Sequence, residues 1–414
     1  MLDLRTCVFS VASGFVLLFS YGCNSQNSIE RVDDLDIYSR LEALPLESKT
    51  ALEQITPGKS ILIDKGWFIW GASVIKGEDS RYHMFYSRWP HGSRGRSYDP
   101  SDRAFDGMQG WLKYSEIAYA VSDNPVGPFR PVKTILKGTG NKDDWDCYSA
   151  HGAHIKKFGG EYYLYYSSTN PANTRPDEVQ CPLDTVWSRF VAGQRMGVLV
   201  ADSIENIVNG KFRRFSKTPV LTPDGVNTFG TVNNGTVTKG PEGLYYMIFK
   251  SAPPDLSHAT TWIGTAKTPT GPFKVKANVF KERQYAVEDP YLWYDKNRDR
   301  FYALVKEFGE QKLVSQFGAL ALLTSKDCLS WALAQHNLAA LREAKFADGS
   351  KMDLAHIERP QVLFDDNGEP LVIYAAAAVN SPFAVASPVE SGRPWHNSFN
   401  IHLPITPAKD TVDE

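Results

Sequence analysis

The sequence predicts an all-β fold, a five-bladed β-propeller with a short N-terminal helical lead-in. Three observations predict it: a hairpin pattern that occurs five times, a second strand-and-turn element after each of the first four copies, and strands rich in aromatic and β-branched residues. Two hairpins per copy make a four-stranded sheet, and five such sheets around one axis make a propeller. The alternative is a β-sandwich or two separate β domains, which fits five matched hairpin pairs less well.

Each copy of the pattern consists of a short strand, a Gly or Asn turn and an aromatic strand, which is typical of a β-hairpin. The first strands of the copies begin at or near Trp70, His151, Asn233, Glu288 and Glu358. The copies follow one another at roughly 55 to 80 residues, so insertions must lie between some of the strands. The two largest candidates are the polar, aromatic segments Pro90–Gly110 and Asn170–Ala192, which suit rim loops beside a site.

The N-terminus predicts export. Arg5 precedes the apolar stretch Val8–Phe19, which has the length of a signal-peptide core and is too short to span a bilayer. This stretch leads to Cys23 after a small residue, so residues 1–23 resemble a bacterial lipoprotein signal with lipid on Cys23. Tyr21 fits that pattern imperfectly, and plain secretion to the periplasm or medium stays open.

The rest of the chain divides into three predicted segments. Residues 24–60 form a linker with short helices, because Asp33–Thr56 is charged and Leu-rich. Residues 61–405 form the propeller, and residues 406–414 form a tail. The last strand, Phe399–Leu403, has no later partner in the sequence, so we expect it to close the ring with the first blade.

Composition excludes some classes of partner. The 45 Lys and Arg residues nearly balance the 47 Asp and Glu residues, for a net charge of −2. This balance argues against a nucleic-acid partner. No CxxC or HExxH spacing indicates a metal site, and we expect no cofactor. A structural calcium ion in the axial channel is compatible with the fold, but no ligand motif supports it.

The innermost strands of a propeller converge on its axis, so the first residues of the repeats are expected to meet in one central pocket. The residues collected in this way are Trp70, His151, His154, Asn234, Glu288, Asp289, Glu358 and Arg359. Charged residues at the start of apolar strands are costly to bury without a partner. Glycoside cleavage explains them, because it needs a carboxylic acid at the leaving oxygen and a second carboxylate as base or nucleophile.

At these residues the sequence resembles a known family. The Gly-Pro-Phe turns, Asp289-Pro290 and Glu358-Arg359-Pro360 resemble the five-bladed propeller glycosidases of glycoside hydrolase family 43 and its relatives, including family 117. The resemblance extends from about Asp64 to Leu403. It implies a base from the first blade, an Asp that orients and tunes, and a Glu acid from a later blade. Asp289 matches the tuning Asp; Glu358 matches the acid, although Glu288 has the same spacing to a proline.

The first blade departs from that pattern. Trp70-Gly71-Ala72 stands where the resemblance implies an Asp, and the nearest carboxylate is Asp64. Asp64 could enter the pocket from a shifted strand or could cap a turn. His151 could serve as the base instead, since His suits proton transfer near neutral pH, or could only hydrogen-bond to sugar hydroxyls.

Several residues are candidates for substrate binding. Arg359, Arg88 and His154 suggest an anionic group on the substrate, such as a uronate carboxylate or a sulfate, because Arg binds these groups in bidentate fashion. Pairing of Arg359 with Asp289 or Glu288 is the structural alternative. Trp70 is a candidate platform for a sugar ring.

The function predicted from these residues is a glycoside hydrolase that acts on oligosaccharides or polysaccharide fragments at the cell envelope. A glycoside phosphorylase resembling family 130 is the first alternative, because it needs only one carboxylate, with Arg and His holding phosphate. A non-catalytic glycan-binding lipoprotein is the second. The predicted partners are an oligosaccharide, with its anionic group as an option, and a membrane contacted only through the lipid anchor.

Overall fold

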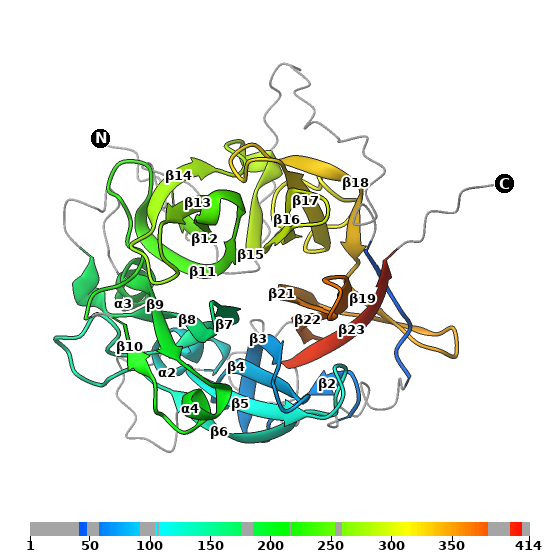
Figure 1. The fold of residues 1–414 in the computed structure, drawn as a ribbon, viewed down its shortest axis with the longest axis horizontal. Helices are drawn as coiled ribbons and strands as arrows, with labels where there is room; N and C mark the ends of the chain where they lie inside the picture. Colours follow the sequence, from blue (N-terminus) through cyan, green and yellow to red (C-terminus); the bar gives the residue numbers. More distant parts are fainter. Residues whose placement is uncertain are drawn as a thin grey trace.

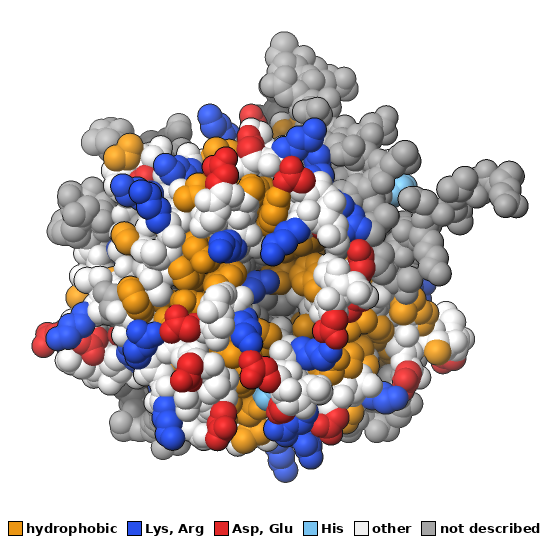
Figure 2. Space-filling view, in the orientation of Figure 1, with side chains coloured by type: hydrophobic (Ala, Val, Ile, Leu, Met, Phe, Trp, Pro, Cys, Tyr) orange, Lys and Arg blue, Asp and Glu red, His pale blue; other side chains and the backbone are white. Residues whose placement is uncertain are grey.

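The five predicted sheets form one ring around a central axis (Figure 1). The structure, a computed structural model, describes residues 41–47, 58–91, 104–105, 107–174, 185–215, 217–252, 259–379 and 398–407. Each blade is an antiparallel sheet, and in the first four blades the strands follow the chain from the axis outward. The prediction of a five-bladed β-propeller is therefore confirmed. In the face seen in Figure 2 the centre of the ring is hollowed, and Lys and Arg side chains gather around the hollow.

The first three blades each contain four strands in chain order. Blade 1 consists of β3 (Trp67–Lys76), β4 (Tyr82–Pro90), β5 (Glu116–Ser122) and β6 (Arg130–Leu136). Blade 2 consists of β7 (His151–Phe158), β8 (Glu161–Thr169), β9 (Gln194–Ala201) and β10 (Arg213–Arg214). Blade 3 consists of β11 (Phe229–Lys239), β12 (Tyr245–Ala252), β13 (Thr260–Ala266) and β14 (Lys274–Asn278).

The last two blades differ at their outer edges. Blade 4 consists of β15 (Val287–Asp295), β16 (Arg300–Glu307), β17 (Leu320–Ser325) and β18 (Ala332–Ala340). A small hairpin of β19 (Glu343–Lys345) and β20 (Lys351–Asp353) follows it. Blade 5 consists of β21 (His356–Phe364), β22 (Pro370–Ala378) and β23 (Phe399–Pro407), completed by β1 (Leu41–Ala43) and β2 (Ile61–Leu62).

The ring closes within blade 5. Strand β23 pairs with β22 on one side and with β1 and β2 on the other, with Leu41 opposite Pro407 and Ile61 opposite Ile401. The expected partner, the first blade, is thus replaced by the strands that precede it. The expected helical lead-in also differs, because its described part contains strand β1; most of Asp33–Thr56 lies outside the described residues. Pairing removes an open sheet edge, which a short helix there would not do.

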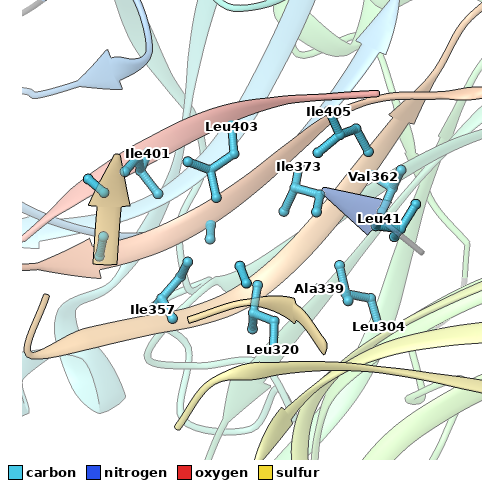
Figure 3. Close-up of a cluster of buried hydrophobic side chains, with 14 of the residues drawn as sticks. Leu41, Leu304, Leu320, Ala339, Ile357, Val362, Ile373, Ile401, Leu403 and Ile405 are labelled. Carbon is cyan, nitrogen blue, oxygen red and sulfur yellow. The ribbon is translucent and has the colours of Figure 1, made fainter. Parts of the chain in front are cut away.

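The side chain of Leu41 explains why this N-terminal strand is held. Leu41 is buried in a large apolar cluster with Leu320 of blade 4 and with Ile373 and Leu403 of blade 5. Figure 3 shows these side chains packed between the two blades and β1. Burial of such residues contributes about 1.5–3 kcal/mol each, so β1 is part of the propeller core.

Every innermost strand carries the same irregularity near its start. The ladder between the first and second strand shifts register there in all five blades. At each shift one residue has positive φ: Gly71 (76°), Gly152 (65°), Asn234 (55°), Asp289 (53°) and Arg359 (56°). Gly adopts this conformation freely and Asn and Asp tolerate it, whereas Arg is strained in it. These five residues, which we call the bulge ring, mark the level of the candidate site.

A second ring of polar residues lies two positions further along each innermost strand. Its members are Ser73, His154, Thr236, Tyr291 and Gln361. Ser73 Oγ donates to Gln361 Oε1 at 3.2 Å, and the Tyr291 hydroxyl donates to the Val362 carbonyl at 2.9 Å. Each such bond joins two different blades, so this ring fixes the blades against one another below the bulge ring.

Two buried His residues predict that the folded protein becomes less stable as the pH falls. Burial lowers the pKa of His154 to about 3 and that of His402 to about 4. Between about pH 6.5 and these values the unfolded chain binds protons that the folded chain does not, so stability falls as the pH falls. We expect each His to lower the free energy of unfolding by about 2 kcal/mol at about pH 5. Urea unfolding at about pH 7 and pH 5 measures this; His402→Gln should reduce the difference, and equal midpoints would contradict it.

Candidate active site

Contacts between neighbouring blades follow one rule at the level of the bulge ring. A residue on the second strand of one blade contacts the start of the first strand of the next blade. From blade 1 to blade 2, Ser87 Oγ accepts from the Gly152 N–H at 2.8 Å. From blade 2 to blade 3, Ser167 Oγ accepts from the Asn234 N–H at 3.3 Å. These contacts bind backbone only, so this part of the ring is uncharged.

The same positions are charged in blades 3 to 5. Lys250 Nζ contacts Glu288 Oε1, and Lys306 Nζ contacts both Glu288 Oε2 at 3.3 Å and Glu358 Oε1 at 2.5 Å. His356 Nδ1 lies 3.0 Å from the same Glu358 oxygen. The row Lys250–Glu288–Lys306–Glu358–His356, which we call the charged row, therefore runs without a break across three blades.

The charged row holds its groups in defined protonation states. Burial alone would raise the pKa of Glu358, but Lys306 and His356 outweigh it and hold that pKa well below its usual range. Burial lowers the pKa of Lys250 to about 8, against the opposing charge of Asp289. At neutral pH Glu358 is thus an anion and Lys250 an ammonium group near its titration range.

A second row lies beside it on the bulge ring itself. Asn234 Nδ2 donates to Asp289 Oδ1 at 2.5 Å, and Arg359 Nη1 lies 3.7 Å from the same oxygen. The Arg359 side chain continues across the axis over Gly71 and Gly152, because a methyl group on Gly152 would come within 2.6 Å of Arg359 Nη2. Asp289, Asn234 and Arg359 thus join blades 3, 4 and 5 to blades 1 and 2.

Solvent reaches this cluster from one side. The side chains of Lys250 and Glu288 are 17% and 13% exposed, whereas those of Lys306 and Glu358 are 6% and 8% exposed. Asn234 is also only partly buried. Three of the four predicted catalytic carboxylates, Glu288, Asp289 and Glu358, therefore share a cluster that is most exposed at Glu288 and Lys250.

His151 of blade 2 lies beside the Arg359 side chain. Its Nδ1 lies 2.9 Å from Ser115 Oγ, and its ring lies 5.0 Å from that of Trp111 in α2 (Trp111–Tyr114). Burial, with Arg359 nearby, lowers its pKa well below the ordinary value, so the imidazole is neutral. A neutral ring suits a hydrogen bond to a sugar hydroxyl.

Helix α2, which directly follows the first predicted insertion (Pro90–Gly110), packs next to His151 against the described end of the second (Asn170–Ala192). Trp111 lies 6.1 Å, ring to ring, from Trp187 of α3 (Val186–Ala192), and Leu112 shares an apolar cluster with Phe190. Trp111 and Trp187 are both only partly buried. Trp70 is 6% exposed and packs with Ala376 and Ala378, so Trp111 offers a sugar ring more surface than Trp70 does.

Asp64 and Arg88 belong to a separate network. Asp64 Oδ2 accepts from the Tyr86 hydroxyl at 2.7 Å and pairs with Arg88. Arg88 also donates from Nε to Glu116 Oε1 at 3.0 Å and lies 4.1 Å from the Trp67 ring centre. The contacts of this pair among the described residues stay within blade 1 and its lead-in, so the structure does not bring Asp64 or Arg88 into the axial cluster.

This network predicts that Asp64 acts on stability and not on turnover. Asp64→Asn should lower the free energy of unfolding by about 1–3 kcal/mol, because it leaves Arg88 with an incomplete set of partners. Turnover per folded molecule should stay within about twofold of the unmodified protein. A loss of turnover as large as that of a charged-row variant would place Asp64 in the site after all.

His154 also lies outside the substrate-facing cluster. It is fully buried, its Nε2 accepts from the Val237 N–H at 3.0 Å, and its Nδ1 lies 3.2 Å from Gln361 Oε1. Both ring nitrogens are engaged by protein atoms, which leaves none for a sugar. It lies two residues after Gly152 and belongs to the second ring of polar residues, with Ser73, Thr236, Tyr291 and Gln361.

Three residues of the cluster were missed by the sequence analysis: Lys250, Lys306 and His356. A signal for the two lysines exists, since each ends an apolar run in the second strand of its hairpin, and each lies directly opposite the residue before the bulge. Nothing in the sequence alone shows that these strands reach the next blade. Among the described residues no group of three metal-binding side chains occurs, and no helix is long and apolar enough to cross a membrane.

The fold and site geometry can be compared with known proteins. Solved structures with the same architecture include a family 117 glycoside hydrolase of the marine bacterium Zobellia galactanivorans (TM-score 0.55, 14% identity, 90% of this chain and 92% of that one). An α-L-arabinofuranosidase of Lactobacillus brevis gives a TM-score of 0.52 at 12% identity, over 82% of this chain and 91% of that one. A thermostable family 43 glycoside hydrolase gives 0.52 at 11%, over 83% and 91%. The chain has the fold of these propeller glycoside hydrolases. No protein-family model and no curated protein sequence matches it.

Proposed function

We propose that the chain is a glycoside hydrolase that cleaves O-glycosyl bonds in oligosaccharides or polysaccharide fragments at the axial cluster. One observation carries the proposal: Glu288, Asp289 and Glu358 come from two blades to one partly exposed cluster, at the position where the innermost strands converge. The shared fold with propeller glycosidases supports it. Glycoside hydrolysis requires two carboxyl groups that flank the scissile bond, and this cluster supplies candidates for both.

The charges suggest a division of roles. We assign Glu358 as the base that accepts a proton from the attacking water as the water oxygen bonds to the anomeric carbon. Lys306 and His356 hold its pKa well below its usual range, so in this role substrate binding has to weaken these two contacts. The departing glycosidic oxygen then takes a proton from Lys250, whose pKa of about 8 leaves it protonated at neutral pH, either directly or by way of the Glu288 carboxylate that Lys250 contacts. Asp289 orients the site through Asn234 and Arg359. The roles of Glu358 and the proton donor thus differ from those that the resemblance implied.

The site of action proposed for this activity is the cell envelope. The support is the signal-like residues 1–23 and Cys23, which lie outside the described residues. Metabolic labelling with a radioactive fatty acid in a bacterial host tests the anchor. Label on the full chain that disappears in Cys23→Ala is expected, and equal labelling of both proteins would contradict it.

A phosphorylase is the second candidate, and the first blade favours it. Gly71 stands at the bulge-ring position of blade 1, so the described part of that blade brings no carboxylate to this level to activate water, while three cations lie nearby. Those cations could hold phosphate. Cleavage that requires inorganic phosphate and releases a sugar phosphate would establish this function in place of hydrolysis.

The experiment that tests the proposal is a substrate screen. The purified mature chain is incubated with neutral and acidic oligosaccharides, with and without phosphate, and the products are identified by chromatography and mass spectrometry. We expect a free reducing sugar without phosphate. Oligosaccharide binding without any turnover would show a glycan-binding protein instead.

A further inference from the structure

Arg359 occupies the place where the axis of the propeller would otherwise be open. It follows Glu358 on β21, with φ of 56°, so its side chain leaves the strand in a strained direction. Its Cβ would lie 3.1 Å from a methyl group on Gly71, and its Nη2 would lie 2.6 Å from one on Gly152. Only glycine in blades 1 and 2 leaves room for this guanidinium, and we call these two residues the glycine cradle.

The guanidinium is buried, and one of its nitrogens lacks a hydrogen-bond partner in the described part of the chain. Arg359 is 9% exposed, and its Nη1 has no hydrogen-bond partner among the described residues. The nearest anion is Asp289 Oδ1 at 3.7 Å, too long for a hydrogen bond, and that oxygen already accepts from Asn234. A buried donor without an acceptor costs about 1–3 kcal/mol, so the position suits a ligand that supplies one.

The neighbouring carboxylates do not compete for this role. Glu358 accepts from Lys306 and contacts His356, and Glu288 lies between Lys250 and Lys306. Both are thus occupied by lysines and not by Arg359. The two lysines of the charged row are thus matched by two carboxylates, whereas Nη1 of Arg359 has no hydrogen-bond acceptor among the described residues. A planar guanidinium binds a carboxylate or sulfate by two parallel hydrogen bonds.

We propose that the axial cluster recognises a sugar carrying an oxyanion, a uronate carboxylate or a sulfate ester, through Arg359 in the glycine cradle. This inference rests on the proposed function for the identity of the ligand as a sugar, and it assigns the substrate class of the same site. The anion takes the acceptor position at Nη1, and Asn234 and His151 are left to bind hydroxyl groups. Arg359 is therefore a specificity residue, and Glu288 and Glu358 keep the chemistry.

Binding of simple sugars tests the proposal. The full mature chain is titrated with glucuronate, galacturonate, galactose 6-sulfate, glucose and galactose, and affinity is followed by ligand-observed NMR. We expect at least one anionic sugar to bind about tenfold more tightly than its neutral counterpart, and Arg359→Gln to remove that difference. The two uronates and the sulfate distinguish which oxyanion is taken. Arg359→Lys keeps the positive charge but lacks the paired N–H donors of the guanidinium, so it should retain only part of the preference for anionic sugars.

Arg213→Gln is the matched control, because Arg213 is 66% exposed and pairs with Glu161 on the outer part of blade 2. It should leave all affinities unchanged. Equal affinity for anionic and neutral sugars, or no binding of any anionic sugar by a folded protein, overturns the inference even if neutral oligosaccharides are cleaved. If the protein prefers anionic sugars and Arg359→Gln loses that preference, the inference is upheld. If no substrate is turned over in addition, only the hydrolase proposal is contradicted.

Discussion

Replacing Glu358 by Gln should lower turnover of the substrate found in the screen by about 10²–10⁴-fold. The amide has nearly the same shape, but it cannot accept a proton from water or carry the negative charge that Lys306 and His356 stabilise. Turnover measured as released reducing sugar per folded molecule gives the effect. Glu288→Gln should have an effect of the same order if Glu288 is the proton donor, and a smaller one if Lys250 is.

Two further variants make this result decisive. Glu343→Gln is the matched control, since Glu343 lies on the peripheral hairpin strand β19 and pairs with Lys351; its turnover should be unchanged. Lys250→Met should separate the two candidate donors, because loss of the alkaline limb near about pH 8 assigns that limb to Lys250. Unchanged turnover in Glu358→Gln would exclude the assigned role.

The largest effect on stability is expected from Lys306→Met. Lys306 is 5% exposed and neutralises two carboxylates from neighbouring blades. Its removal leaves buried negative charge without a counter-ion, which costs about 3–5 kcal/mol. Glu358 would lose the charge that lowers its pKa, so protonation would relieve the cost, and the deficit should shrink as the pH falls from about 7.5 to 5.5. Urea unfolding of the variant and the unmodified protein measures it.

The double variant Lys306→Met, Glu358→Gln is the control for this mechanism. Without the charge on Glu358, most of the cost of losing Lys306 should disappear, and the pH dependence should weaken. A deficit that is the same at both pH values, and the same in the double variant, would show that Lys306 acts through packing of its alkyl chain.

The sequence predicted the propeller because its signals are local. Alternating strands and Gly or Asn turns set each hairpin within about twenty residues, and five copies then imply a ring. The closure of that ring could not be predicted in the same way. Strand β1 contains only Leu41–Ala43, and its pairing with β23 depends on contacts more than 350 positions apart, from Leu41 to Pro407.

The candidate site was predicted in part for the same reason. Glu288, Asp289, Glu358, Asn234 and His151 were placed together because each begins an innermost strand. Lysines on second strands were missed, since reaching the next blade depends on how the blades pack. The sequence also left Asp64 open, and the structure shows its carboxylate bound to Tyr86 and Arg88, an outcome that depends on side chains from another strand.

The bulge ring gives a simple account of the first-blade departure. The five equivalent positions are Gly, Gly, Asn, Asp and Arg, and the two glycines face the one long side chain. The guanidinium of Arg359 thus fills space that a first-blade carboxylate would need. The ion pairs of the charged row lie in blades 3 to 5.

Incorporation of oxygen-18 from labelled water tests the central claim most directly. The substrate from the screen is cleaved in labelled water, and the new reducing end is analysed by mass spectrometry. Hydrolysis at the axial cluster predicts one labelled oxygen per cleavage by the unmodified protein and almost no product from the Glu288→Gln, Glu358→Gln double variant. Product without label, or equal labelled product from the double variant, would contradict the account.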